Sequence, residues 1–578
     1  MLSQSFEHLV DQIKRNDLYL VNKNNPYLNT NQWAEDNALQ ELISYTGSNG
    51  ILSLNIYEKI LWIDSRYYKS AQESYKDSRI QIRSQSESEG LKQYIEAWIK
   101  KQKKANIKLS TDKWSSKFID DLGLKRDDIQ MTDHQFIKNH HPLRKIDFDE
   151  SSSLVHDYAK KINLIQKNIN KFEIHFITNP EDIAWLLNIR ASDFPYMRSV
   201  KGKMLIANHF IFLFTDLNSI QLNYLKKRIP ICKVFGNEKA WIDTLGKVFN
   251  SQTSIKVHFN YALRPGAISF KDHLILENLA LNKDQLLHRE RSLIEQCRVN
   301  KQENEIKVLK NNGTLLSEVM TESINKIQNE LDNGVKISEA QVSDMVLKIS
   351  KKYGAMQPCF APIVASGKNS TFPHHIPVDK KIIKKGELIM LDIGFYFKPY
   401  TYASDMTRTF LAGSKTVASQ QQKKVFTEVL KAFLLQYSIK FKPGSLKAKQ
   451  LDAKGRDSIT SSNLTDYEFI HSTGHGLGIV DHELAITIGP SSNITLQKGN
   501  TYSIEPGMYF TKEGSEEESF GIRLEDIVYI IKHNGVCCHR SLNYHHFDER
   551  LIDFGQLGYE MSNILKEYNK QCVIIKSK

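Results

Sequence analysis

The hydrophobic and polar positions in the first quarter of the chain follow strand-like and helix-like patterns in turn. Residues 51–56 alternate as a half-buried strand does, and residues 59–68 read as a second strand that runs into a loop. Residues 69–117 are rich in Ser, Gln and Lys, which predicts exposed helix and loop instead of core. A turn-rich segment at residues 142–153 predicts a domain boundary.

The same alternation then restarts, with a predicted strand at residues 173–178 and a predicted helix at residues 182–187. The two α/β stretches have similar lengths and suggest a duplication, although no residue-level repeat is visible. A long helical pattern begins near residue 300, and strand signals dominate after Pro358. We therefore predict an α/β (α+β) protein whose three domains span residues 1–150, 151–300 and 301–578.

Composition narrows the class of protein. The chain has 578 residues, of which 40% are hydrophobic and 25% charged, as in ordinary globular proteins. The net charge is +12, but the lysines are spread out and no nucleic-acid module is visible, so we predict no nucleic-acid partner. No apolar run is long enough to span a bilayer and no signal peptide is visible, which predicts no membrane association and a cytoplasmic location. The six cysteines lack CxxC pairs and predict a reduced protein.

The last third of the chain holds residues suited to binding metal. Four acidic residues and one histidine stand at strand ends or among glycines: Asp392, Asp405, His475, Glu505 and Glu525. Four carboxylates in one pocket would repel one another unless cations held them together. Oxygen donors with one imidazole suit Mn²⁺, with Zn²⁺ or Co²⁺ as alternatives. The sequence thus predicts a dinuclear centre for hydrolysis.

Local patterns support three parts of this site. Asp392 and Asp405 flank a predicted hairpin with its turn at Pro399–Tyr400, which would place them at facing positions of paired strands. Taken alone, this pair of aspartates fits a charged hairpin tip equally well. The glycines around His475 exclude a helix and let the backbone approach closely. Arg523 and Glu525 lie two apart on a predicted strand, so the arginine would clamp the glutamate from the same face.

Together these motifs resemble the metallopeptidase family with the pita-bread fold, which includes prolidases, creatinases and aminopeptidase P. The motifs are Asp405-Met-Thr-Arg-Thr, Gly474-His-Gly, Glu505-Pro-Gly and Gly521-Ile-Arg-Leu-Glu525. Residues 364–374 resemble the family segment that supplies a substrate-facing histidine, and residues 542–553 resemble the tail of three-domain Xaa-Pro aminopeptidases. The resemblance implies two creatinase-like domains, a C-terminal pita-bread domain and a homodimer. The hairpin is two residues longer than usual, and the acidic segment 512–519 is inserted.

The resemblance also implies roles for the site residues. Asp405 and Glu525 would bridge two divalent cations, Asp392 would complete one, and His475 and Glu505 the other, with a hydroxide between them. Glu505 would act as general base. His374 and His482 would bind the substrate carbonyl, and Arg523 would hold the surrounding shell. The implied substrates are peptides with proline in the second position, cleaved before the proline by a metallo-exopeptidase.

Two alternatives remain. A prolidase would cleave only Xaa-Pro dipeptides, but the three-region layout favours an aminopeptidase. A non-catalytic pita-bread module would bind proteins, but such relatives have typically lost ligands, whereas this chain keeps all five.

Overall fold

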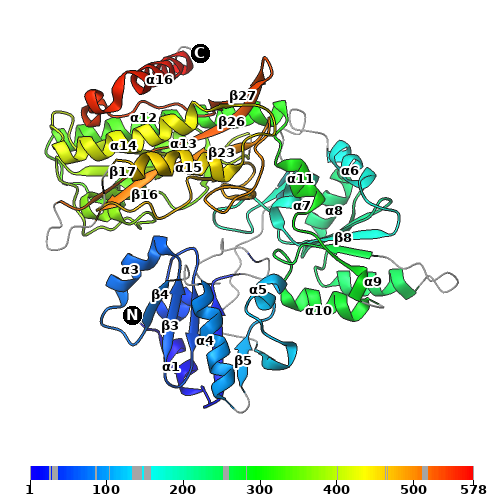
Figure 1. Ribbon diagram of the computed structural model, residues 1–578. Helices are drawn as coiled ribbons and strands as arrows, with labels where there is room; N and C mark the ends of the chain where they lie inside the picture. Colours follow the sequence, from blue (N-terminus) through cyan, green and yellow to red (C-terminus); the bar gives the residue numbers. More distant parts are fainter. Residues whose placement is uncertain are drawn as a thin grey trace. The chain divides into compact units, whose positions relative to one another are not determined.

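The computed structural model describes residues 2–24, 28, 37–84, 88–102, 105–132, 146–148, 158–250, 260–280, 283–399, 401–462, 464, 466–510 and 518–576. The chain divides into two compact units, residues 1–296 and 297–578. Figure 1 shows both units as mixtures of helices and strands, as the sequence predicts.

The first sheet of the first unit has the strand order β4-β3-β2-β1-β5-β6 among the described residues. Its strands are β1 (Asp17–Asn22), β2 (Ile51–Leu54), β3 (Lys59–Ile63), β4 (Gln81–Ser84), β5 (Asn106–Leu109) and β6 (Ile129–Met131). Its helices are α1 (Gln4–Asp11), α2 (Ala38–Ile43), α3 (Ser65–Tyr75), α4 (Ser88–Lys101) and α5 (Ser116–Asp121).

Two predictions for this region are wrong. The segment 59–68 does not run into a loop: β3 ends at Ile63, and Asp64 caps α3 by accepting a hydrogen bond from the Arg66 N–H. The segment 69–117 is not merely exposed, because it supplies β4, α4 and β5. On α4 the buried residues recur at helical spacing, and the lysines that suggested exposure lie between them. These buried residues are Leu91, Ile95 and Trp98.

The second sheet has the order β12-β11-β10-β8-β13-β14. Its strands are β8 (Glu173–Ile177), β10 (Lys203–Ile206), β11 (Ile211–Phe214), β12 (Lys233–Phe235), β13 (Asn260–Leu263) and β14 (Leu286–His288). The helices of this region are α6 (Tyr158–Lys167), α7 (Pro180–Leu187), α8 (Ser219–Arg228), α9 (Ala240–Asn250), α10 (Phe270–Leu279) and α11 (Leu293–Arg298). A separate strand pair joins β7 (Ile146–Phe148) to β9 (Ile189–Ala191).

The two sheets share one topology. The corresponding central strands are β1 in the first sheet and β8 in the second. Each pairs antiparallel with one neighbour (β2 or β10) and parallel with the other (β5 or β13). The outer pairs also correspond: β2–β3 and β10–β11 are antiparallel, whereas β3–β4, β11–β12, β5–β6 and β13–β14 are parallel. This is the arrangement that a duplicated α/β unit would have. The predicted boundary near residue 150 falls on residues 149–157, which lie outside the described residues, so it stays a prediction.

The second unit is built on one large antiparallel sheet whose main path is β16-β17-β19-β26-β23-β21-β22. These strands are β16 (Ile363–Ser366), β17 (Leu388–Ile393), β19 (Met406–Leu411), β21 (Gly474–Gly476), β22 (Glu483–Ile488), β23 (Thr501–Ile504) and β26 (Glu525–His533). Strand β27 (Val536–Ser541) pairs with β26 and with β20 (Lys440–Phe441). Two small ribbons pair β15 (Ala355–Pro358) with β18 (Phe395–Phe397), and β24 (Gly507–Phe510) with β25 (Phe520–Arg523).

Two hydrophobic clusters join helices to this sheet (Figure 1). One includes residues of α12 (Glu303–Asp332) and α13 (Glu339–Lys352) together with β17. The other includes residues of α14 (Gln420–Tyr437), α15 (Ala448–Thr460) and α16 (Phe554–Lys576) together with β23 and β26. The helices thus cover apolar positions of the strands.

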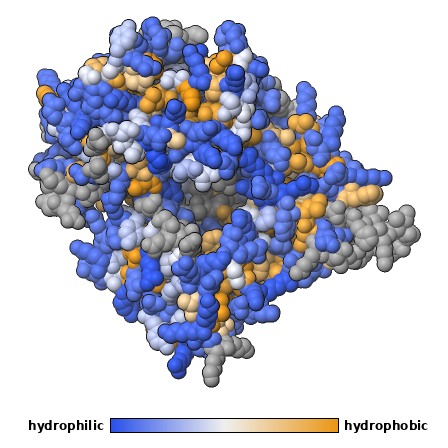
Figure 2. Space-filling view, in the orientation of Figure 1, coloured by the Kyte–Doolittle hydropathy of each residue, from blue (hydrophilic) through white to orange (hydrophobic). Residues whose placement is uncertain are grey.

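The outer surface carries few extended apolar areas on the face drawn in Figure 2, where hydrophobic residues form scattered patches among hydrophilic ones. Among the described residues, we find no helix long and apolar enough to cross a membrane. All six cysteines are free thiols. Cys537 is buried and its neighbour Cys538 is partly exposed, as expected for adjacent positions on a strand.

Candidate metal centre

Strand register brings the predicted ligands to one face of the large sheet. Asp392 on β17 pairs with Thr407 on β19, which in turn pairs with Glu525 on β26. Directly paired residues on antiparallel strands point to the same face. Glu505 follows the last residue of β23, the strand next to β26.

The hairpin prediction for the two aspartates is partly wrong. Asp405 lies one residue before β19, and it is Thr407, not Asp405, that faces Asp392. The chain between the aspartates also forms β18, which leaves the sheet to pair with β15. Asp405 still shares the face of Asp392, because it is two positions from Thr407. Of the predicted turn, Tyr400 lies outside the described residues.

His475 stands at the centre of the acidic group. Its Nε2 lies 3.6 Å from Asp405 Oδ2, 3.5 Å from Glu505 Oε1 and 4.0 Å from Glu525 Oε1. The backbone N–H of His475 donates to Ser503 Oγ, which itself donates to Glu505 Oε1. One hydroxyl on β23 therefore fixes the histidine and the glutamate relative to each other.

Glycine is required beside this histidine. A Cβ at Gly474 would lie 2.0 Å from the carbonyl oxygen of Ser503, so no larger residue fits between β21 and β23. The predicted absence of a helix around His475 is confirmed, since β21 spans Gly474–Gly476.

Arg523 is placed differently from the prediction. Arg523 and Glu525 do not share a strand, because β25 ends at Arg523 and β26 begins at Glu525. The arginine forms its ion pair with Asp392, with 2.6 Å between Nη2 and Oδ2. Its Nη1 also donates to Tyr509 Oη and its Nη2 to the carbonyl oxygen of Pro373. Glu525 is held by Thr407, whose hydroxyl donates to its Oε2 over 2.7 Å.

Several buried carboxylate oxygens at this site have no hydrogen-bond donor among the described residues. They are Asp392 Oδ1, Asp405 Oδ1 and Glu525 Oε1. Burial raises the pKa of Asp405 and of Glu525 well above the ordinary range, and neighbouring carboxylates raise both further. Unsatisfied, crowded oxygens of this kind are what divalent cations would neutralise, so the residues present fit a metal centre.

The pKa values of His475 and Glu505 shift so as to favour the charged forms, whereas those of Asp405 and Glu525 favour the neutral forms. Burial lowers the pKa of His475, but the carboxylates of Asp481, Glu505 and Glu525 outweigh it and raise the pKa to about 9. Burial raises the pKa of Glu505, but His475, His471 and Arg523 outweigh it, so the pKa of Glu505 lies below its ordinary value. Among the four carboxylates of the predicted ligand set, Glu505 is thus the one whose pKa is lowered, while the pKa values of Asp392, Asp405 and Glu525 are raised.

Of the two predicted substrate histidines, His482 contacts the predicted ligand His475 directly, and His374 is next to a residue that contacts Arg523. The ring of His482 stacks on that of His475, with centroids 3.8 Å apart, and its side chain is 60% exposed. His374 is half-buried and follows Pro373, whose carbonyl oxygen accepts from Arg523. The substrate contacts of both histidines stay predictions.

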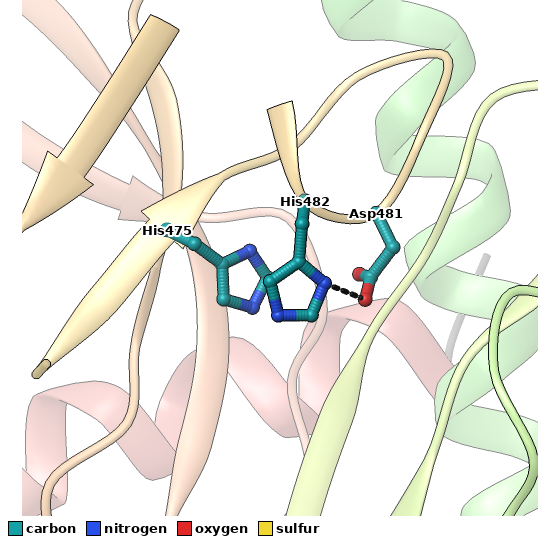
Figure 3. A group of neighbouring side chains, drawn as sticks. All are labelled: His475, Asp481 and His482. Atoms are coloured by element: carbon teal, nitrogen blue, oxygen red, sulfur yellow. Dashed lines mark ion pairs between the residues drawn. The ribbon is translucent and has the colours of Figure 1, made fainter. Parts of the chain in front are cut away.

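The sequence reasoning missed Asp481. Its side chain is 6% exposed, and Oδ2 lies 2.8 Å from His482 Nδ1 (Figure 3). The signal was present in the sequence, since Asp481 lies between the glycines around His475 and the predicted substrate residue His482. A position in a loop gave no periodicity from which burial could be inferred.

Comparison with known proteins identifies similar families for two parts of the chain. Residues 308–532 match the model of metallopeptidase family M24, and residues 138–305 match that of the creatinase/prolidase N-terminal domain. Most of the second unit is therefore similar to metallopeptidase family M24. The predicted resemblance to this family is thereby confirmed.

Individual relatives carry related names. The chain is 24% identical to the Xaa-Pro aminopeptidase app-1 of Caenorhabditis elegans, with 91% of this chain and 86% of that protein covered. It is 33% identical to an Xaa-Pro dipeptidase of Pyrococcus horikoshii, over 42% of this chain and 62% of that protein. For the relatives that are 30–37% identical, the chain spans 48–63% of the relative's length.

Among solved structures, the X-prolyl aminopeptidase from Caenorhabditis elegans, described as a cytosolic enzyme with a di-nuclear active site, has a TM-score of 0.84 at 19% identity. The similarity covers 96% of this chain and 91% of that chain. It confirms the predicted fold class, with creatinase-like α/β regions followed by an M24 pita-bread domain.

Proposed function

We propose that this protein is a metal-dependent aminopeptidase that removes the N-terminal residue from peptides with proline in the second position. The observation that carries the proposal is the convergence of His475, Asp405 and Glu525 on one sheet face, with buried carboxylate oxygens that lack donors. The similarity to a worm Xaa-Pro aminopeptidase over 91% of the chain supports this substrate class.

The proposed roles follow the position of each side chain. Asp392, Asp405, His475, Glu505 and Glu525 would hold two divalent cations. When bound, these cations would supply a water of lowered pKa and polarise the scissile carbonyl group. Glu505 is the proposed general base, because its pKa is low enough to keep it ionised at neutral pH. It would accept a proton from the attacking water and pass it toward the leaving proline nitrogen.

The surrounding residues would orient the reacting groups. His482, with its exposed side chain stacked on His475, and His374 would donate hydrogen bonds to the carbonyl oxygen. Arg523 would hold Asp392 through their 2.6 Å ion pair and fix the loop at Pro373. Proline is distinguished from other residues because its peptide bond lacks an N–H and its ring fixes the backbone.

We further propose Mn²⁺ as the metal, with Zn²⁺ or Co²⁺ as alternatives, because four carboxylates and one imidazole form a predominantly hard donor set. A homodimer and a cytoplasmic location belong to the same proposal. The location is supported by the free thiols and by the cytosolic description of the worm enzyme.

A dipeptidase is the second candidate, since relatives 33% identical are named Xaa-Pro dipeptidases. The structural similarity favours the aminopeptidase. The solved prolidase from Pyrococcus furiosus covers 67% of this chain, whereas the worm aminopeptidase covers 96%.

The test compares three peptides on the full-length protein loaded with Mn²⁺: Ala-Pro-Ala, Ala-Pro and Ala-Ala-Ala. We expect release of alanine from Ala-Pro-Ala, little from Ala-Ala-Ala, and loss of release with a chelator that added Mn²⁺ reverses. Cleavage of Ala-Pro alone would support the dipeptidase. No cleavage of either proline peptide by protein with two bound cations would contradict both candidates.

A further inference from the structure

Asp481 is a buried acid outside the predicted ligand set. It lies in the loop between β21 and β22, and its side chain is only 6% exposed. Oδ2 is paired with His482 Nδ1 at 2.8 Å, and Oδ1 has no donor among the described residues. Figure 3 shows the carboxylate beside the stacked rings of His475 and His482. A buried carboxylate oxygen without a partner costs free energy unless something compensates it.

Burial raises the pKa of Asp481, but the imidazoles of His482 and His475 outweigh it, so the pKa of Asp481 lies below its ordinary value. The imidazole of His482 carries a positive charge only when protonated, and its side chain is largely exposed. After burial, Asp481 is the largest contributor to the raised pKa of Asp405, so the two carboxylates lie close enough to repel.

The geometry connects Asp481 to the proposed metal ligands. One ligand atom from each of Asp405, His475 and Glu525 lies within 4.8 Å of the others. A second group, formed by His475, Asp481 and His482, satisfies the same distance. His475 belongs to both groups, so a cation held by this histidine would be within reach of Asp481 after a small movement of the loop side chain.

We propose that Asp481 is a further carboxylate ligand of the metal centre and binds the cation that His475 holds. This inference rests on the proposed metal centre and deepens it. A fifth carboxylate adds a hard oxygen donor and one negative charge, which favours Mn²⁺ over softer Zn²⁺.

The test is calorimetric titration of metal-stripped, full-length protein with Mn²⁺ and, separately, with Zn²⁺. The variants are Asp481→Asn, which removes the charge but keeps the size, and His482→Asn, which removes the ion-pair partner but keeps the carboxylate. We expect wild type to bind two Mn²⁺. Asp481→Asn should bind one of them at least about tenfold more weakly, with a smaller effect on Zn²⁺. His482→Asn should keep near-wild-type Mn²⁺ affinity.

Folding is checked by thermal denaturation of the same proteins. Metal-free Asp481→Asn should fold but be less stable than wild type, because it loses the charge that pairs with His482, and its stabilisation by Mn²⁺ should be smaller. Unchanged Mn²⁺ affinity in Asp481→Asn would overturn the inference and leave the proposed function standing. Equal weakening in both variants would also overturn it, since Asp481 would then act only by positioning His482. Failure of wild type to bind two cations would overturn both proposals.

Discussion

At the scale of single residues, the pKa values of the metal centre are set by negatively charged side chains that are buried close together. Asp405 and Glu525 are almost fully buried, and their raised pKa values mean that both bind a proton more readily than an ordinary carboxylate in the metal-free centre. Glu505 differs from them because His475 and His471 lower its pKa. Chemically similar carboxylates thereby acquire different roles from their surroundings.

Glu505→Gln tests the proposed base. The substitution keeps the size of the side chain and its contact with Ser503 but removes the capacity to accept a proton. We expect kcat on Ala-Pro-Ala to fall by about 10²–10⁴-fold, while circular dichroism shows a folded protein. Glu560→Gln, at an exposed position on α16, is the matched control and should leave kcat unchanged. Near-normal turnover of Glu505→Gln would refute the role.

Arg523→Gln tests the ion pair with Asp392. Both side chains are at least nine-tenths buried, so the substitution leaves a buried carboxylate without its partner. We expect the free energy of unfolding of the metal-free protein to fall by about 3–5 kcal/mol in urea titrations. Saturating Mn²⁺ should reduce the loss, because a cation would neutralise Asp392.

The control for this variant is Lys570→Gln, which breaks an exposed pair with Glu567 and should cost no more than about 1 kcal/mol. An equal loss in the two variants would contradict the importance of the buried pair.

At the scale of elements, helix α14 and strands β23 and β27 meet at a buried histidine. His539 Nε2 accepts from the hydroxyl of Tyr502, and Nδ1 donates to the carbonyl oxygen of Tyr437. This tautomer satisfies both ring nitrogens only when the imidazole is neutral. Burial lowers the pKa of His539 to about 4, below the value of 6.5 expected in the unfolded chain.

The sign of the pH dependence follows from that shift. Between pH 6.5 and 4 the unfolded chain binds a proton at His539 that the folded chain does not. The stability contribution of this histidine is therefore complete above pH 6.5 and is lost as the pH falls toward 4, by about 3 kcal/mol at most. His539→Gln should flatten this part of the curve of unfolding free energy against pH. His533→Gln, at an exposed position, should not. Parallel curves for wild type and His539→Gln would contradict the assignment.

At the scale of the whole molecule, the two units divide the chemistry unequally. All five predicted ligands and Asp481 lie in residues 297–578, whereas the two sheets of matching topology lie in residues 1–296. A ligand stabilises only the unit whose folded form binds it.

We therefore expect differential scanning calorimetry to show metal-dependent and metal-independent unfolding. Free Mn²⁺ at about 100 times its Kd should stabilise the second unit by about 2.7 kcal/mol for each bound cation and raise its transition temperature. The transition of the first unit should stay in place. Chelator should reverse the shift, and Mg²⁺ at the same concentration serves as the weakly binding control. If Mn²⁺ raised the transition temperatures of both units equally, the expectation that the units unfold independently would be contradicted.

Much of the site could be predicted from the sequence because its signals are local. Each predicted metal ligand is indicated by the few residues around it. Examples are an aspartate after an apolar run, a histidine between glycines and a glutamate before Pro-Gly. The strands and helices at residues 173–187 and the long helix after residue 300 were predicted for the same reason, since hydrophobic periodicity requires no distant partner.

What the sequence left undecided depends on contacts between distant segments. The register of β17, β19 and β26 decides that Thr407 faces Asp392 and that Arg523 pairs with Asp392 instead of supporting Glu525. The core formed by residues 69–117 and the burial of Asp481 were likewise missed, because a lysine-rich helix or a polar loop becomes buried only through what packs over it. The sequence alone determined which residue types are available for chemistry. The tertiary structure decided their partners and protonation, since both depend on distances and on exclusion of water.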